Sequence, residues 1–171
     1  MALRPGRCYK KIHRAFTRQS QRKPRKSYIK GVPRPKITEF EVGRKGKYDN
    51  TVYLVSQEDA QVRHNALEAV RVTISQYLDK NLGKGVQFFL KIRIFPHHVL
   101  RENTLATGAG ADRFQQGMRQ SFGKPIGTAA QVRKKQKILE IRINKAGIPT
   151  VKAALKRALN KLPIDCRVVI E

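Results

Sequence analysis

The sequence predicts an α+β fold: a single-domain, two-layer sandwich in which two helices pack on a mostly antiparallel sheet, with an extended basic N-terminal arm and a long glycine-rich loop. Three observations predict it. Several short runs alternate apolar and polar residues, which is typical of strands with one buried face. Two longer stretches repeat apolar residues at helical spacing. The length of 171 residues suits one hydrophobic core.

Residues 1–36 predict an arm and not a part of the core. They hold thirteen Lys or Arg and no acid, and four prolines interrupt any helix or strand ladder. Such a segment buries too little apolar surface to offset the entropy of ordering it, so we expect it to be mobile alone and to fold on a partner. Its aromatic residues, Tyr9, Phe16 and Tyr28, suit either stacking on bases or anchoring onto the domain. Residues 37–171 then form the sandwich.

The domain begins with strand and helix patterns. Residues 37–42 and 51–55 are β-prone runs separated by the turn formers of GRKGKYDN, which predicts a hairpin. Ser56 followed by Asp59 resembles a capping box and predicts that a long amphipathic helix starts there and ends at Gly83. The apolar stripe of this helix is expected at Val62, Ala66, Leu67, Val70, Ile74 and Leu78.

The second half of the chain continues with strands and one helix. In residues 86–95 one set of alternating positions is wholly apolar and the other carries the cations Lys91 and Arg93, and Pro96 ends or bends this strand. Further strands are expected at 98–101, at 139–143 and, to close the chain, at 164–170. Pro149 fits the first position of a helix. This helix places one apolar stripe, Val151, Ala154, Leu155, Ala158, Leu159 and Leu162, opposite the cations Lys152, Lys156, Arg157 and Lys161.

The charge balance points to a polyanionic partner. The chain has 37 Lys and Arg against 12 Asp and Glu, a formal net charge of +25, and a compact fold carries such self-repulsion alongside an anion such as nucleic acid. A membrane-binding amphipathic helix would set its cations opposite Trp or Phe, whereas these cations are spread along the chain and Trp is absent. We therefore expect no membrane partner. Without a long apolar stretch or a signal peptide, the protein is expected to be cytoplasmic.

Catalytic, cofactor and metal chemistry finds little support. Cys8 and Cys166 lie at opposite ends of the chain and are interpreted as free thiols. The adjacent His97 and His98 would point to opposite faces of a strand, so no metal site is expected. Acids are scarce, and no Ser, His and carboxylate spacing stands out, although triad partners can be distant in sequence. We expect a protein that is not an enzyme and has no cofactor.

Residues 104–127 form the most unusual segment, with five glycines, the cations Arg113, Arg119 and Lys124, and a single acid. Glycines let a backbone approach a phosphate closely, so one interpretation is a loop shaped by RNA, and the other is a flexible surface insertion. A P-loop is excluded because five residues separate Gly117 from Gly123 and a proline follows Lys124. The Lys91 and Arg93 face and the cations of the second helix also suit phosphate contact, but a solvated surface is favoured for the helix.

Four stretches carry a resemblance to a known family: RPGRCYKK, KGVPRPKI, RIFPHHVLREN and AGADRFQQGMRQSFGKPIGTAAQV. They closely resemble the archaeal and eukaryotic form of universal large-subunit ribosomal protein sixteen, also called ribosomal protein ten-e. The resemblance runs along the whole chain. It implies a structural, non-catalytic protein of the cytoplasmic ribosome, seated on large-subunit rRNA beside the tRNA channel and near the peptidyl transferase centre. Neighbouring ribosomal proteins and tRNA would be its further partners, with no homo-oligomer.

The resemblance and the charge of the arm together assign candidate site residues. By motif, rRNA contacts are implied at Arg4, Arg7, Lys10, Lys11, Arg14, Arg113, Arg119 and Lys124. The charge of the arm adds Arg18, Arg22, Lys23, Arg25 and Lys26. In the family a loop reaches toward bound tRNA, and here it corresponds to Glu102, Asn103, Thr104, Leu105, Ala106, Thr107, Gly108, Ala109, Gly110, Ala111 and Asp112. The bacterial form differs in the glycine-rich segment, so its contacts there do not transfer.

Two other functions use the same sequence features. A free-standing RNA chaperone would use the same basic arm but would stay mostly in the soluble fraction, whereas a ribosomal protein would co-sediment with large subunits. An RNA-modifying enzyme would show turnover on RNA that is lost on mutation of one carboxylate or His, and no catalytic site is evident for it.

Overall fold

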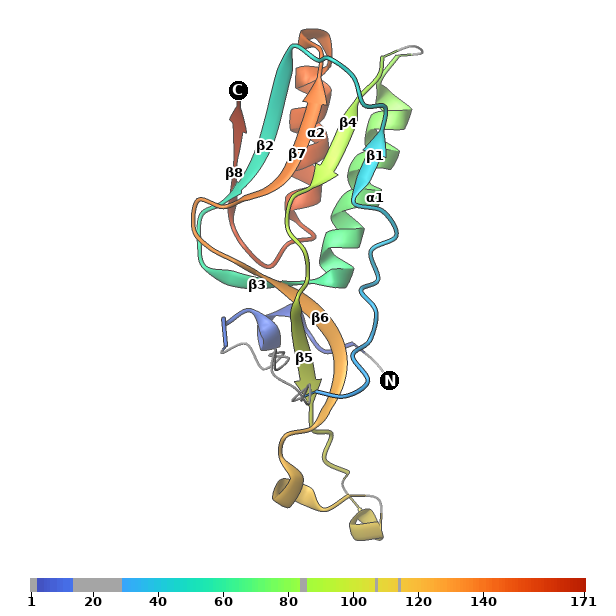
Figure 1. Ribbon diagram of the computed structural model, residues 1–171, viewed down its shortest axis with the longest axis vertical. Coiled ribbons are helices and arrows are strands. Elements are labelled where there is room, and N and C mark those ends of the chain that lie inside the picture. The colour runs from blue at the N-terminus through green and yellow to red at the C-terminus, as the bar shows by residue number, and fades with distance from the viewer. Residues whose placement is uncertain (1–2, 14–28, 84–85, 107, 114) are drawn as a thin grey trace, which may run out of the picture.

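The computed structural model describes residues 3–13, 29–83, 86–106, 108–113 and 115–171, and it has the expected α+β architecture in one domain. Its larger sheet has five antiparallel strands in the order β1-β4-β7-β2-β8 (Figure 1). These strands are β1 (Glu41–Gly43), β4 (Phe89–Ile92), β7 (Lys137–Ile143), β2 (Asn50–Ser56) and β8 (Cys166–Ile170). The two long helices, α1 (His64–Asn81) and α2 (Ile148–Leu159), lie together against one face of this sheet.

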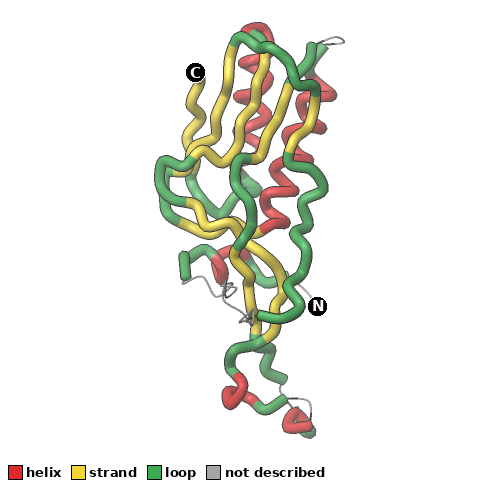
Figure 2. Tube along the Cα trace, viewed as in Figure 1, coloured by secondary structure: helices red, strands yellow, loops and turns green. Residues whose placement is uncertain are grey.

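A second, smaller sheet extends the molecule away from the helices. It has three antiparallel strands in the order β3-β6-β5, namely β3 (Ala60–Arg63), β6 (Lys124–Val132) and β5 (His98–Glu102). In Figure 1 the connection between β5 and β6 projects beyond this sheet at the end of the long axis. Residues 29–40 run as an extended segment along the molecule to β1 (Figure 2).

The hydrophobic core lies between the five-stranded sheet and the helices. Because paired residues of neighbouring strands share a face, Leu54, Leu139 and Ile92 point together toward the helices, and all are at least 95% buried. The expected stripes of both helices meet them, since Leu67, Leu78 and Leu155 are fully buried. Each such side chain contributes roughly 1.5–3 kcal/mol relative to exposure. Packing of the core therefore holds the helices on one face of the five-stranded sheet, and the residues that alternate with the core positions lie on the opposite face.

The structure corrects two predictions at the start of the domain. β1 does not form a hairpin with β2: Val42 lies opposite Leu90 of β4, and β4 and β7 separate β1 from β2. The turn formers bend the chain, but the burial of apolar strand faces decides which strands pair. The capping box at Ser56 is also wrong. Ser56 Oγ donates to Glu58 O in a turn before β3, so Val62 is a buried strand residue and α1 starts only at His64.

The structure also places a strand that the sequence patterns missed. β6 occupies Lys124–Val132, so the glycine-rich loop, expected to extend to residue 127, ends at 123. The stretch GTAAQV is poor in the β-branched and aromatic residues that mark strands. It forms a strand because it lies between β3 and β5, where Gly127, Thr128, Ala129 and Ala130 are all buried and larger side chains would not fit as closely.

Candidate nucleic-acid interface

The described residues expected to bind RNA lie in two segments next to the smaller sheet. One is the N-terminal segment, residues 3–13, which contains a short 3-10 helix at Gly6–Tyr9. The other is the projecting loop, residues 103–123, between β5 and β6. Arg4 Nε pairs with Glu102 Oε1 at the end of β5, so the two segments meet at the base of the loop (Figure 1). They therefore form one continuous basic region and not two separate ones.

Side chains of the smaller sheet hold the N-terminal segment by its backbone. Gln61 of β3 donates its backbone N–H to Lys10 O at 2.8 Å, and its side-chain amide donates to Tyr9 O at 3.3 Å and to Lys11 O. Arg63 Nη1 donates to Arg4 O at 2.9 Å, and its guanidinium lies 5.4 Å from the centre of the Tyr9 ring. Tyr9 thus contacts the domain in this structure. With several carbonyls bound to the domain, the side chains between them are left at the surface.

The cations of the N-terminal segment fall into two groups. Arg4 and Lys10 are paired with carboxylates, the latter at 2.9 Å from Glu58 Oε1. The hydrogen bond from Lys10 is the main reason that the pKa of Glu58 is lowered. Arg7 and Lys11 are exposed and, within the part of the chain that the structure describes, pair with no carboxylate. The expected contacts Arg14, Arg18, Arg22, Lys23, Arg25 and Lys26 lie outside the described residues.

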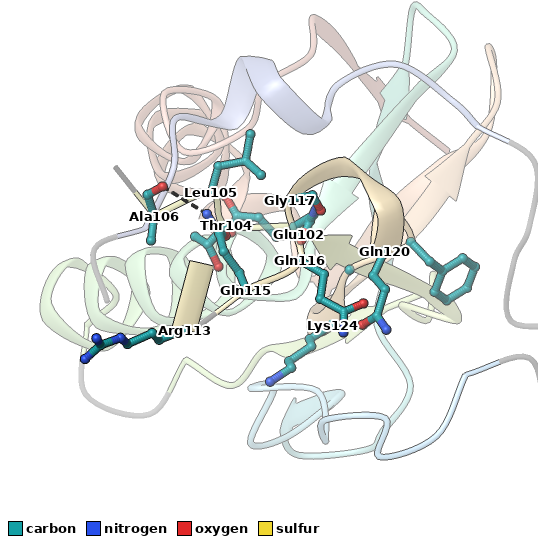
Figure 3. A pocket seen from close by; sticks show the side chains of 13 residues that line it. Glu102, Thr104, Leu105, Ala106, Arg113, Gln115, Gln116, Gly117, Gln120 and Lys124 are labelled. Atoms are coloured by element: carbon teal, nitrogen blue, oxygen red, sulfur yellow. Dashed lines mark hydrogen bonds between the residues drawn. The ribbon is translucent and has the colours of Figure 1, made fainter. Parts of the chain in front are cut away.

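The projecting loop folds around an open hollow of about 860 Å³ (Figure 3). Gln115 Nε2 donates to Ala106 O at 2.9 Å, and Asn103 Nδ2 donates to Gly117 O at 3.5 Å, so the two arms of the loop are joined across the hollow. The hollow is lined by Glu102, Asn103, Thr104, Leu105, Ala106, Arg113, Gln115, Gln116, Gly117, Gln120, Phe122, Gly123 and Lys124. Several of these belong to the segment that the family resemblance places near tRNA; of that segment, Thr107 and the side chain of Asp112 are not described.

The three predicted cations of the loop are all exposed. Arg113 is the last residue of the short 3-10 helix Ala111–Arg113, Arg119 lies in the last turn of a second one, Gly117–Gln120, and Lys124 begins β6. In Figure 3 the side chains of Arg113 and Lys124 extend away from the backbone of the loop. Because the loop backbone is cross-linked while these cations are directed outward, it presents positive charge without burying it.

Sequence reasoning missed an apolar component of the loop. Leu105, Met118 and Phe122 are 53%, 68% and 49% exposed. Arg101 of β5 lies 3.7 Å from the centre of the Phe122 ring and donates to Phe122 O at 2.6 Å. The signal in the sequence was large apolar residues without helical or strand periodicity in a glycine-rich segment. Exposed apolar and cationic groups side by side match the sugar and base surfaces and the phosphates of a nucleic acid.

Burial affects the remaining candidate groups in the described part of the chain, which are two histidines and one cysteine. His64 Nδ1 lies 3.0 Å from Thr128 Oγ1, and burial lowers the pKa of both His64 and His98. Burial raises the pKa of Cys166 to about 12, which keeps this thiol protonated and unreactive. No group of three or more His, Cys, Asp or Glu among the described residues is arranged to hold a metal ion, and no described helix is long and apolar enough to span a bilayer.

The chain is similar to one family of known proteins over nearly its whole length. A family model described as ribosomal protein L16p/L10e matches residues 16–169. A protein of Staphylothermus marinus named large ribosomal subunit protein uL16 is 49% identical over 172 residues, which cover 100% of this chain and 95% of the relative. Proteins of the same name from Hyperthermus butylicus and Methanococcus aeolicus are 47% and 46% identical, over 98% and 99% of this chain and 93% and 95% of the relatives.

Proposed function

The chain belongs to the ribosomal protein L16p/L10e family, and from this membership we propose that it is a structural constituent of the large subunit of the cytoplasmic ribosome that binds large-subunit rRNA. The observation that carries the proposal is the identity of nearly half over the full chain with relatives named for that subunit. The net charge of +25 supports a polyanionic partner independently.

The contacts with rRNA are assigned to the basic region described above. Arg7 and Lys11 of the N-terminal segment and Arg113, Arg119 and Lys124 of the loop are exposed, and none of them forms an ion pair with another described residue, so all five are available to phosphates. Arg4 and Lys10 form ion pairs with carboxylates, which partly neutralise their charge, so they contribute less to the positive potential at this surface. The cations of residues 14–26, which lie outside the described residues, are assigned further rRNA contacts from their charge. Neutralising phosphates releases condensed counterions, which makes the binding depend on salt.

The projecting loop is assigned a contact with tRNA as well as rRNA, beside the tRNA channel near the peptidyl transferase centre. Its support is the family resemblance of residues 102–112, together with the projection of the loop beyond both sheets (Figure 1). A loop held at its base by a β-ladder and joined across its hollow reaches outward without collapsing onto the domain. The exposed Leu105 and Met118 then provide apolar contact area for sugars and bases.

Two measurements test the ribosomal assignment. The tagged chain, expressed at its natural level, should co-sediment with large subunits in near-stoichiometric amount, while a free RNA chaperone would stay mostly at the top of the gradient. If the purified chain neutralises on the order of 6 to 10 phosphates, its affinity for large-subunit rRNA should fall by roughly a thousandfold or more between 50 and 200 mM salt. An affinity that stays constant over that range would contradict the electrostatic account.

The assignment of the loop needs its own variant. Arg113→Ala/Arg119→Ala should weaken engagement of tRNA or rRNA, while the thermal midpoint stays near that of the parent, because both side chains are exposed. The matched control is Lys152→Ala/Lys156→Ala, which removes two exposed cations from α2. Subunit assembly and translation at parental levels in the loop variant would identify the loop as a surface insertion without a role in binding.

A further inference from the structure

The five-stranded sheet has a second face that neither helix covers. Strand register fixes its residues: Tyr53 of β2 and Lys91 of β4 both lie opposite Glu140 of β7, and Arg142 lies opposite Phe89. These positions alternate with Leu54, Leu90 and Ile141, which point into the core. In Figure 1 both helices lie behind the sheet, so this open face is turned toward the viewer.

A buried carboxylate lies at the centre of the open face and fixes two arginines. Glu140 is only 1% exposed, and it accepts hydrogen bonds of 2.6 Å from Arg142 Nε and from Arg93 Nη1, one on each carboxylate oxygen. Burial opposes ionisation of Glu140, but these two hydrogen bonds outweigh it and keep its pKa below the ordinary value. Arg93 and Arg142 therefore share one fully charged anchor, and their positions on the sheet are set by it.

The anchor leaves both arginine side chains partly exposed. The side chains of Arg93 and Arg142 are 44% and 45% exposed, and each guanidinium carries five N–H donors, of which one is used by Glu140. One cation would balance the charge of Glu140, so the second adds a net positive charge that the fold does not need. Two pre-positioned, partly exposed guanidiniums with donors that Glu140 does not use match the oxygens of phosphate groups.

The surface around Arg93 and Arg142 also carries more positive than negative charge. Among the described residues, register and ion pairs place on the open face the cations Lys45, Lys91, Arg93, Lys137, Arg142 and Arg167 and the carboxylates Glu41, Glu140 and Glu171. The Tyr53 ring lies beneath two of them, with Lys137 Nζ 3.6 Å and the Arg93 guanidinium 5.9 Å from its centre. These contacts hold long side chains along the sheet, which reduces the entropy lost when they bind a ligand.

We propose that Arg93 and Arg142, fixed by Glu140 on the helix-free face of the five-stranded sheet, bind backbone phosphates of large-subunit rRNA. The choice of rRNA as the polyanion rests on the proposed function, while the site itself rests on the geometry of the sheet. It is a contact separate from the N-terminal segment and the projecting loop, and it gives the protein a rigid phosphate-binding surface besides its extended ones. The family resemblance assigned no residue to this face.

The test measures binding of the full chain to large-subunit rRNA of the same organism, transcribed in vitro. Affinity is measured by filter binding at several salt concentrations. Arg93→Gln/Arg142→Gln removes the two charges, and a second variant adds Glu140→Gln so that no buried carboxylate is left unpaired. The matched control is Lys152→Gln/Lys156→Gln, which removes the same charge from the exposed side of α2, behind the sheet. Circular dichroism and thermal melting of each variant check folding.

Both sheet variants should bind at least about tenfold more weakly than the control, with a plot of log affinity against log salt shallower by about 1.4 to 1.8, because two phosphate contacts are lost. Equal affinity and slope in the sheet variants and the control would overturn the inference. Failure of the parent chain to bind rRNA at all would overturn the proposed function as well, so the two failures are distinguishable.

A measurement on the unmutated protein covers the case in which the variants fold poorly. Phenylglyoxal modifies accessible arginines, and mass spectrometry gives the extent of modification at Arg93 and Arg142 with and without rRNA. Protection by rRNA alone supports the site. Equal modification in both samples contradicts it, and so does protection that arises only when other large-subunit proteins are added, because the face would then contact a protein.

Discussion

Gly123 at the base of the projecting loop offers the sharpest test of how the loop is held. Its φ is +74°, a left-handed conformation that costs a residue with a side chain about 1–2 kcal/mol. A Cβ at this position would also lie 2.6 Å from Glu102 C and O and 2.8 Å from Asn103 N. The obstacle is backbone, which cannot rotate away, so the end of β5 has to shift.

Gly123→Ala should therefore carry a cost beyond the backbone conformation. The shift weakens the last pair of the ladder, Glu102 with Lys124, and a hydrogen bond is worth about 0.5–1.5 kcal/mol. The sum is about 1.5–3.5 kcal/mol. Gly117→Ala is the matched control, because its φ is +56° and a Cβ there meets nothing within 4 Å, so it carries only the conformational cost.

Urea unfolding and amide hydrogen exchange together measure this difference. If the strain stays in the native state, Gly123→Ala lowers the free energy of unfolding by more than Gly117→Ala does. If the end of the hairpin opens to relieve the strain, the unfolding free energies converge but the amides of Glu102 and Lys124 exchange faster in Gly123→Ala alone. Two variants that match in both measurements would refute the close approach of Gly123 to β5.

Two further predictions follow from buried polar groups. Gln61→Leu removes the side-chain donor that binds Tyr9 O and Lys11 O, so it should lower the free energy of unfolding by about 1–3 kcal/mol and speed proteolysis within residues 3–13, whereas the exposed Gln76→Leu should do neither. The folded-state pKa of Glu140 is lowered, so its stabilisation is present above the unfolded pKa near 4.5 and is lost as the pH falls through the folded pKa. Glu140→Gln should therefore flatten the stability profile below pH 4.5, and profiles that run parallel to the parent would contradict this.

Much of the fold could be predicted because burial leaves periodic traces in the sequence. The stripes that became the inner faces of α1 and α2, and the alternation at Leu139, Ile141 and Ile143, all report one-sided contact with a core. The hairpin and the capping box were wrong because both rested on local turn chemistry. Strand pairing depends on residues distant in sequence: β1 pairs with β4, and α1 lies between these two strands in the sequence.

The candidate site was less predictable because its parts leave different signals. A count of cations finds the basic arm, and glycine content marks the projecting loop. By contrast, the pairing of Arg4 with Glu102 and the anchoring of Arg93 and Arg142 by Glu140 join residues that share a location only after folding. In the sequence, Glu140 is indistinguishable from an ordinary polar residue of a strand. Only the folded structure shows that it is buried and bound by two guanidiniums.

The position of β2 in the larger sheet has a consequence for how the chain is made. β2 lies between β7 and β8, and both of these are synthesised long after it. Until they emerge from the exit tunnel, β2 has no sheet partner on either edge, and exposed strand edges are prone to pair with other chains. Completing the sheet is therefore a late step of biosynthesis.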